Sequence, residues 1–288
     1  MKQTQPTNQQ KSANMTYCVA IKVAAGMVFA SDSRTNAGLD QVSTFRKMIV
    51  YERPGDRFMT MLSAGNLSIS QSVREQLQAE KMHVDGGDPL TIWNARSMFD
   101  AARILGQTMR RVDALDGPTL RSNGIDASST MIFGGQIAGE VPRLFLVYST
   151  GNFIEATPET CYFQIGESKY GKPVLDRILE PTISLADAAK CALISIDSTL
   201  KSNLSVGLPI DLVVYRTDAL ESDQMVCIDD SNPYFAMVRG SWGQRLREAF
   251  TTMQNPSWDS SVGDFPLRVR SERYPVLRKI HNPDEKIV

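Results

Sequence analysis

Three strand-length apolar segments near the start of the chain constrain its fold more than any other feature. Residues 17–23 and 27–30 are separated by a short turn of small residues, and 48–51 follows a mostly polar stretch. Two apolar runs joined by a tight turn are typical of a β-hairpin. The sequence therefore predicts a hairpin followed by a third strand. The residues that flank these strands are then candidates for a common site.

Those flanking residues carry groups suited to hydrolytic chemistry. Thr16 precedes the first strand, Asp32 follows the second and Lys47 precedes the third. A threonine hydroxyl needs a base within hydrogen-bond reach, and an N-terminal threonine can use its own amine, with a pKa of about 7.7–8.0. Lys47 would lower the pKa of the hydroxyl, and Asp32 would orient Lys47. Spacing alone also fits non-catalytic roles, with Thr16 as an ordinary strand start, Asp32 as a strand end and Lys47 as a solvated lysine.

Several stretches of the chain are similar in amino-acid sequence to one known family. They are M-T-Y-C-V-A-I-K at 15–22, F-A-S-D-S-R-T-N-A-G at 29–38, S-T-F-R-K-M at 43–48, L-S-A-G-N-L at 62–67 and F-Q-I-G-E-S-K-Y-G-K-P at 163–173. They resemble proteasome-type β-subunits, which are N-terminal-nucleophile hydrolases, and most closely the bacterial Anbu (ancestral β-subunit) family. The resemblance extends to about residue 215. It implies catalytic roles for Thr16, Asp32 and Lys47.

The rest of the chain fits an α+β fold. Strands are expected at 57–63, 129–135, 143–150, 161–166 and 210–215, and helices at 67–80, from Asp88 through residue 109, at 167–179, 185–200 and 233–253. A loop is expected at 116–118, where the sequence reads Asp-Gly-Pro. Strands in runs and helices in pairs favour antiparallel sheets. The resemblance makes this a four-layer αββα sandwich with two antiparallel sheets.

Further site residues follow from the resemblance. Gly65 is the expected oxyanion donor, because a glycine after a buried strand lets a substrate approach the backbone N–H; a plain strand-to-helix turn is the alternative. Ser168 is expected to support the terminal amine, with a helix N-cap as its alternative role. Proteasome subunits usually carry an Asp and a Ser in the segment that here reads 201–207. This segment has no Asp, and Asn203 and Ser205 supply hydrogen bonds without charge.

The resemblance also places a substrate pocket for the residue before the cut. Its expected lining is Thr35, Phe45, Ile49, Ser63 and Leu67. These side chains are mostly small or apolar, and none is charged. The sequence therefore predicts an apolar preference.

Composition excludes several other classes of function. Thirty-one basic and 32 acidic residues leave a net charge of −1, which does not favour nucleic acid or an anionic membrane as a partner. The four cysteines show no CxxC spacing and the two histidines cannot form a usual zinc site, so neither a disulfide framework nor a metal is expected. No stretch has the length of a membrane helix, and residues 1–14 are too polar for a secretory signal. A cytoplasmic protein is expected.

Together these patterns predict a threonine-type peptidase or amide hydrolase that acts on a peptide or protein and needs no metal or organic cofactor. Two alternatives stay open: an amidase of the same fold acting on small amides, and a self-assembling scaffold subunit with weak or no hydrolysis. The missing Asp near Asn203 favours the scaffold, whereas the intact Thr16, Asp32 and Lys47 set favours catalysis. The resemblance implies a homo-oligomer, either a ring or an open helix, and does not assure a partner ATPase.

Three parts of the chain are expected: an extension at 1–15, a β-subunit-like domain at 16–216, and a C-terminal helix and tail at 217–288. The mechanism requires a free amine on Thr16. Methionine aminopeptidase trims an initiator Met before a small residue such as Thr. We therefore expect Met15 to be the physiological start, with autolysis of the Met15–Thr16 bond as the alternative.

Overall fold

The computed structural model describes residues 16–36, 42–84, 87–222 and 224–257. The predicted extension at 1–15, and residues 258–288 of the predicted C-terminal helix and tail, lie outside these ranges. By its internal contacts the chain divides into two compact units, Met1–Gly240 and Ser241–Val288. The first unit holds the predicted catalytic residues.

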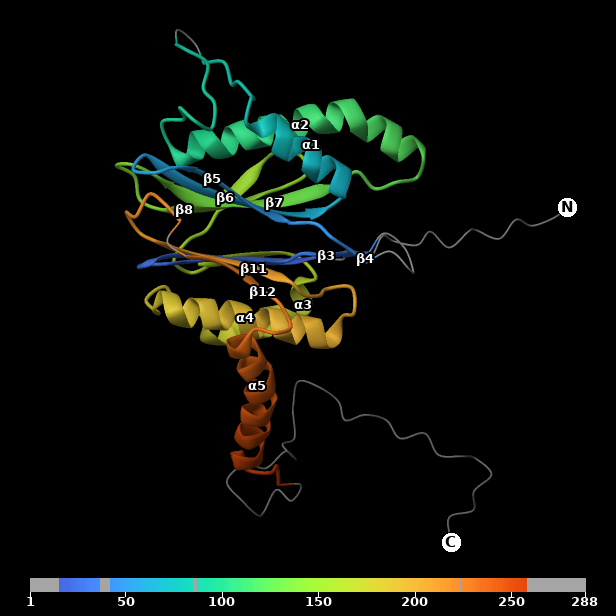
Figure 1. Ribbon diagram of the computed structural model, residues 1–288, viewed down its shortest axis with the longest axis vertical. Helices are drawn as coiled ribbons and strands as arrows, with labels where there is room; N and C mark the ends of the chain where they lie inside the picture. Colours follow the sequence, from blue (N-terminus) through green and yellow to red (C-terminus); the bar gives the residue numbers. More distant parts are fainter. Residues whose placement is uncertain (1–15, 37–41, 85–86, 223, 258–288) are drawn as a thin grey trace, which may run out of the picture. The chain divides into compact units, whose positions relative to one another are not determined.

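Two five-stranded antiparallel sheets form the centre of the first unit (Figure 1). One sheet has the order β10-β1-β2-β11-β12, with β1 (Tyr17–Val23), β2 (Gly26–Asp32), β10 (Tyr162–Gly166), β11 (Ile210–Arg216) and β12 (Gln224–Ile228). The other runs in the order β5 (Met48–Arg53), β6 (Arg57–Gly65), β7 (Ser129–Ile137), β8 (Arg143–Val147) and β9 (Phe153–Glu155). A small two-stranded sheet pairs β3 (Arg34–Asn36) with β4 (Val42–Thr44).

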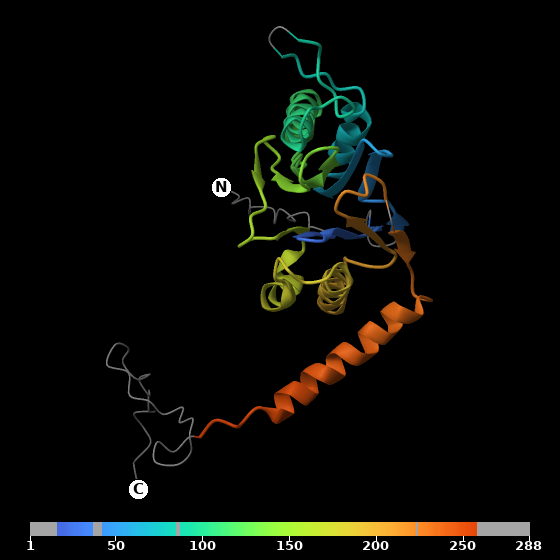
Figure 2. The ribbon, with the colours of Figure 1, turned by 90° about the vertical axis from the view of Figure 1, so that its left-hand side faces the viewer.

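Helices cover the outer face of each sheet, which completes four layers (Figure 2). The helices are α1 (Leu67–Leu77) and α2 (Met98–Ser122) on the β5–β9 sheet, and α3 (Ser168–Ile178) and α4 (Leu185–Ser202) on the sheet that contains β1. A further helix, α5 (Pro233–Thr252), follows β12. The predicted αββα sandwich is confirmed.

Burial on both faces explains why the first hairpin is apolar almost throughout. Alternate residues of a strand point to opposite faces of the sheet. In β1, Tyr17 and Val19 pack in the core beneath α3 and α4, whereas Cys18 and Ala20 pack between the two sheets. In that central layer Phe58 stacks on Tyr215, with ring centroids 4.3 Å apart, and so joins the sheets.

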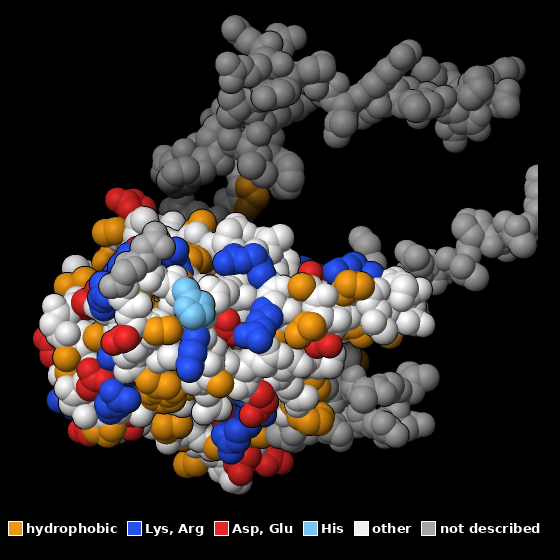
Figure 3. Space-filling model, turned by 90° about the horizontal axis from the view of Figure 1, so that it is seen from above, with side chains coloured by type: hydrophobic (Ala, Val, Ile, Leu, Met, Phe, Trp, Pro, Cys, Tyr) orange, Lys and Arg blue, Asp and Glu red, His pale blue; other side chains and the backbone are white. Residues whose placement is uncertain are grey.

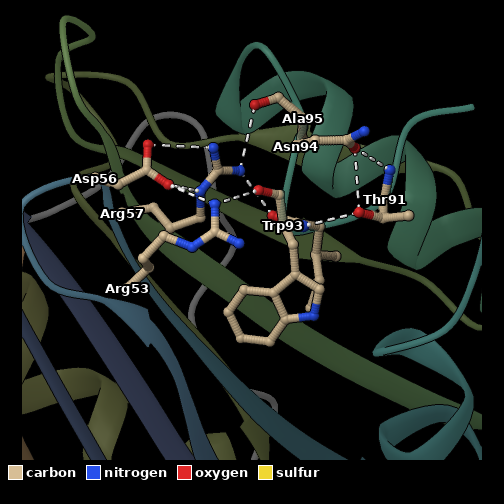
Figure 4. A network of polar contacts seen from close by, with 8 residues as sticks. Arg53, Asp56, Arg57, Thr91, Trp93, Asn94 and Ala95 are labelled. Carbon is tan, nitrogen blue, oxygen red and sulfur yellow. Dashed lines mark hydrogen bonds and ion pairs between the residues drawn. The ribbon is translucent and has the colours of Figure 1, made fainter. Parts of the chain in front are cut away.

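The helix predicted from Asp88 is wrong over residues 88–97, since α2 begins only at Met98 with Ser97 as its N-cap. Arg57 explains the difference (Figure 4). Its buried guanidinium donates to the carbonyl oxygens of Ile92 and Ala95, at 2.8 and 3.3 Å, and these oxygens then lie outside any helical ladder. The apolar residues of this segment are buried as an irregular loop, which sequence periodicity cannot distinguish from a helix.

The loop predicted at 116–118 is also wrong, because α2 continues through Gly117 and Pro118 to Ser122. A proline inside a helix removes one hydrogen bond but does not by itself end the helix. Leu120 packs against the core beyond it and gives the last turn a reason to persist. The strands β3, β4, β9 and β12 were not predicted, since they are short, and β12 is largely exposed.

Candidate active site

The β1–β2 hairpin joins Asp32 to the residue after Thr16 through a buried hydrogen bond. The strand register pairs Cys18 with Ser31, so the next residues outward are Tyr17 and Asp32. The backbone N–H of Tyr17, which follows Thr16, donates to Asp32 Oδ1 at 2.9 Å. Thr16 itself is buried. The predicted meeting of the two hairpin ends is therefore present in the geometry.

Lys47 binds the second oxygen of the same carboxylate. Its Nζ lies 2.7 Å from Asp32 Oδ2 and also donates to the carbonyl oxygen of Arg34 at 2.6 Å. The residue is held from the other sheet as well, because its own carbonyl accepts from the backbone N–H of Ser63 at 3.0 Å. The Asp32 carboxylate thus binds both Lys47 and the backbone N–H of the residue that follows Thr16.

Asp32 experiences two opposing influences on its ionisation. Burial raises the pKa of the carboxyl group, whereas the Lys47 ammonium and the backbone N–H groups of Tyr17 and Gly207 oppose the shift. A carboxylate bonded to an ammonium and two amides keeps Lys47 oriented. The Asp32 side chain is completely buried, and that of Lys47 is nearly so.

A second carboxylate, which the sequence interpretation missed, anchors the neighbours of this pair. Asp211 on β11 accepts from Ser33 Oγ at 2.8 Å and from Arg46 Nη1 at 2.6 Å. Ser33 follows Asp32 and Arg46 precedes Lys47. An acidic residue inside the otherwise apolar run of β11 was the available signal, but only the pairing of β11 with β2 shows its target.

The carbonyl of Thr16 is held by the turn between β10 and α3. The backbone N–H of Glu167 donates to it at 2.7 Å. Gly166 has a φ of +84°, and a Cβ at this position would lie 1.9 Å from Thr16 O. Only glycine allows the backbones to approach so closely. Ser168 begins α3 immediately afterwards.

Gly65 and Ser168 line one common pocket. The pocket also includes Gly166 and polar side chains of the β7 and β8 ends, among them Ser128 and Tyr148. Gly65 has a φ of +112°, and a Cβ there would lie 2.4 Å from Ser128 O. The fold therefore brings the two residues into a common pocket, while the roles of oxyanion donor and amine support stay predictions.

Beneath Thr16 a buried polar network fixes β1 to the outer helices. The Tyr17 hydroxyl lies 2.5 Å from Ser195 Oγ on α4 and accepts a hydrogen bond from the Gln164 amide on β10. The amide of Gln164 also reaches the carbonyl oxygen of Ser168 at 3.5 Å. Burial raises the pKa of Tyr17, so its hydroxyl stays neutral. The network connects Thr16's neighbour to the first turn of α3.

Three of the predicted substrate-binding residues line a second pocket, and Lys47 is also part of its lining. We call it the acyl pocket; its lining is Arg46, Lys47, Met48, Ile49, Met61, Ser63, Leu67, Ser70, Gln71 and Arg74. Ile49, Ser63 and Leu67 come from the prediction. Phe45 is not among the lining residues, and Thr35 lies in β3. The lining includes basic residues that the sequence interpretation did not anticipate.

Comparison with known proteins gives a consistent family. The chain is 46% identical to a solved structure of Anbu (ancestral β-subunit) from Yersinia bercovieri, with 83% of this chain and 98% of that one covered and a TM-score of 0.75. A structure described as the helical assembly of the Anbu complex from Pseudomonas aeruginosa is 44% identical, covering 86% and 100%, with a TM-score of 0.76. This chain belongs to the Anbu family.

The Anbu assignment agrees with a more distant likeness to proteasomes. A proteasome subunit beta from Haloquadratum walsbyi is 26% identical over 210 residues, which is 73% of this chain and 76% of that protein. No protein-family model matches the chain. The Anbu chain thus has a proteasome-like, N-terminal-nucleophile hydrolase fold, as predicted.

In this Anbu chain the segment 201–207, which lacks the usual Asp, forms hydrogen bonds within itself. Asn203 ends α4, and its Oδ1 accepts from the backbone N–H and the hydroxyl of Ser205, at 2.9 and 2.6 Å. The same loop supplies the Gly207 N–H to Asp32. The segment therefore contributes a backbone donor to the site rather than a charge.

Within the ranges that the structure describes, no group of three or more His, Cys, Asp or Glu residues could hold a metal ion. Among the same residues, none of the helices is long and apolar enough to cross a membrane. On the face that carries α1 and α2, basic and acidic side chains are interspersed (Figure 3).

Proposed function

We propose that this Anbu chain is a threonine-type hydrolase of peptide or protein amide bonds, with Thr16 as nucleophile once it is the first residue. The observation that carries the proposal is the buried Asp32 carboxylate, which joins Lys47 Nζ to the backbone N–H that follows Thr16. A buried ion pair costs desolvation and is weak evidence for a stability role alone. Its position at a potential nucleophile favours a chemical role.

The proposed reaction begins with attack of Thr16 Oγ on the amide carbonyl. The neutral Thr16 amine takes the hydroxyl proton, directly or through a water, and passes it to the departing nitrogen as the C–N bond breaks. The Lys47 ammonium lowers the pKa of the hydroxyl, and the N–H of Gly65 stabilises the oxyanion. Water then attacks the ester with the amine again as base, which releases the carboxylic acid and restores Thr16.

The two pockets give each half of the substrate a place. The acyl pocket, which contains Lys47, Ser63 and Leu67, would take the side chain before the cut. The pocket with Gly65 and Ser168 would take the leaving half, and its exposed walls carry hydroxyl groups rather than charges.

We further propose that the chain assembles with copies of itself into an open helical oligomer in the cytoplasm. The support is the 44% identity to the Pseudomonas aeruginosa protein whose structure is described as a helical assembly. A closed ring is the alternative geometry. Light scattering distinguishes either from a monomer of 31.9 kDa.

Labelling of Thr16 tests the proposed chemistry. Protein expressed from Met15 is treated with a β-lactone or a peptide boronate, and the modified residue is located by mass spectrometry. We expect an adduct on Thr16, and no adduct or turnover in Thr16→Ala although its assembly stays intact. An assembled wild-type protein that forms no adduct and cleaves no peptide would instead support the scaffold alternative.

A further inference from the structure

The register of β1 against β10 places Glu167 directly opposite Thr16. Tyr17 pairs with Gly166, so the next residues outward are Thr16 and Glu167. The backbone N–H of Glu167 donates to the carbonyl oxygen of Thr16 at 2.7 Å, so the pairing extends past the ends of the two strands. Directly opposed residues of antiparallel strands have Cβ atoms about 4.5–5.5 Å apart on one face of the sheet. The side chain of Glu167 therefore begins beside that of Thr16.

Strand alternation shows which face of the sheet carries these two side chains. Cys18 on β1 and Ile165 on β10 pack between the two sheets. Thr16 precedes the first of these by two residues, and Glu167 follows the second by two. Residues two apart on a strand point to the same face. Both side chains therefore face the space between the sheets rather than α3 and α4.

The nitrogen of Thr16 faces the same neighbouring strand. In an antiparallel pair the N–H and C=O of one residue point to the same adjacent strand. The carbonyl of Thr16 points to Glu167, whereas the N–H of Tyr17, one residue later, points to Asp32 on β2. A free amine on Thr16 would therefore lie on the β10 side, beside Glu167. Ser168, which was expected from the sequence to support the amine, lies one residue farther along and already belongs to α3.

The carboxylate of Glu167 is weakly compensated for a group so little exposed. Its side chain is 14% exposed, and in the described part of the chain its one ion-pair partner is Lys169, with Nζ at 3.6 Å. The Lys169 side chain is 69% exposed, and its ammonium also lies 5.0 Å from the centre of the Tyr170 ring. Glu167 is the N-cap residue of α3, yet its side chain makes no capping hydrogen bond. A carboxylate removed from water favours a nearby cation, and the protonated Thr16 amine would supply one.

The other titratable groups on the elements around Thr16 do not compete for this role. They are Cys18 on β1, Asp32 on β2, Arg34 on β3, Lys47 before β5, Asp211 on β11 and Lys201 at the end of α4. Both of these acids are bound to basic side chains. Burial raises the pKa of the Cys18 thiol, which therefore stays neutral. On these elements Glu167 is the acid that is left to bind a free amine on Thr16.

We infer that Glu167 is a positioning residue that holds the Thr16 amine and supplies the negative charge that the segment 201–207 lacks. The inference rests on the proposed role of this amine as the base. The carboxylate accepts a hydrogen bond from the amine and so directs the lone pair of the nitrogen toward Oγ. Its charge also stabilises the protonated amine, which raises the pKa of the amine above the ordinary value of about 7.7–8.0. Since the neutral amine is the active form, the acid limb of the kcat/KM profile lies at correspondingly higher pH.

The pH dependence of kcat/KM in Glu167→Gln tests this inference. Protein expressed from Met15 is assayed with a peptide amide that has no ionisable side chain. Glutamine keeps a hydrogen-bond acceptor but removes the charge, so the acid limb should move down by about one pH unit. The ratio of variant to wild-type kcat/KM should therefore be about tenfold higher at pH 6 than on the alkaline plateau. Glu167→Asp keeps the charge on a shorter side chain, and its acid limb should lie between the other two.

A control variant separates this role from a structural one. Asp176→Asn removes an exposed carboxylate, paired with Lys172, from the same helix and should leave the acid limb in place. A purely structural role for Glu167 would lower kcat/KM by the same factor at every pH. Thermal melting of each variant checks that the protein stays folded over the pH range of the assay.

The pKa of the Thr16 amine can also be measured without turnover. Competitive acetylation by acetic anhydride across pH, followed by mass spectrometry of the N-terminal peptide, should give a lower amine pKa in Glu167→Gln than in wild type. An equal pKa in the two proteins, with hydrolysis by wild type, would overturn the role of Glu167 and leave the proposed function intact. A lower pKa in the variant, with no hydrolysis by wild type, would overturn the proposed function and leave the contact between Glu167 and the amine standing.

Discussion

The carboxylate of Asp32 lies 2.7 Å from Lys47 Nζ, and the exposed fractions of the two side chains are 0% and 6%. Breaking a buried pair by removing one partner leaves an uncompensated charge and costs about 3–5 kcal/mol. Lys47→Ala should therefore lower the free energy of unfolding by about that amount and reduce turnover by orders of magnitude. Denaturant unfolding and a peptide assay measure the two effects. Retained activity in this variant would remove Lys47 from the mechanism.

The cost of Lys47→Ala should depend on pH. Burial already raises the pKa of Asp32, and removing the ammonium takes away its main opposing influence. A raised folded-state pKa means that the folded protein binds the proton more readily, so its contribution to stability is present at low pH and lost as pH rises through that pKa. The deficit relative to wild type should thus be larger at pH 7 than at pH 5. Lys190→Ala, in an exposed pair with Asp187, is the control and should cost roughly 0–1 kcal/mol.

Gly166 offers a test of how closely Thr16 is held. An alanine there would place its Cβ 1.9 Å from Thr16 O, and with a φ of +84° the backbone disfavours it as well. Gly166→Ala should displace Thr16 and abolish labelling by the β-lactone. Gly139→Ala is the matched control, with a φ of +83° and nothing within 4 Å of the added Cβ. Gly139→Ala should lose only the roughly 1–2 kcal/mol of stability that the left-handed backbone costs, and its Thr16 should be labelled normally.

Asp211 should act as a positioning residue for the Asp32–Lys47 pair. Asp211→Asn keeps the size of the side chain but removes its charge and one of the two acceptor oxygens, so Ser33 and Arg46 can no longer both be bound. We expect kcat to fall several-fold with little change in KM, since the substrate does not contact Asp211 directly. Asp113→Asn, in an exposed pair with Arg121, should leave both parameters unchanged. Equal losses in the two variants would argue for a general charge effect instead.

The limits of prediction from sequence follow from where each contact lies along the chain. The hairpin that holds Tyr17 and Asp32 was predicted, because its apolar runs and short turn are local features. The segment at 88–97 was mispredicted, because the guanidinium of Arg57 that holds it comes from a distant strand. Asp211 and Arg74 were missed for the same reason: only the folding of β11 and α1 against the β2 and β5 ends brings them to the site.

The N-terminus of Thr16 provides the last test. The proposed base is the Thr16 amine, which is an amide nitrogen whenever Met15 precedes it, and an amide nitrogen cannot accept the hydroxyl proton. Protein expressed from Met15 should begin at Thr16 after methionine removal and be active. Protein expressed from Met1 should be inactive unless the Met15–Thr16 bond is cleaved. N-terminal sequencing and peptide assays of both forms decide this. An uncleaved Met1 form that is as active as the Met15 form would contradict the terminal-amine mechanism, whatever the roles of Asp32 and Lys47.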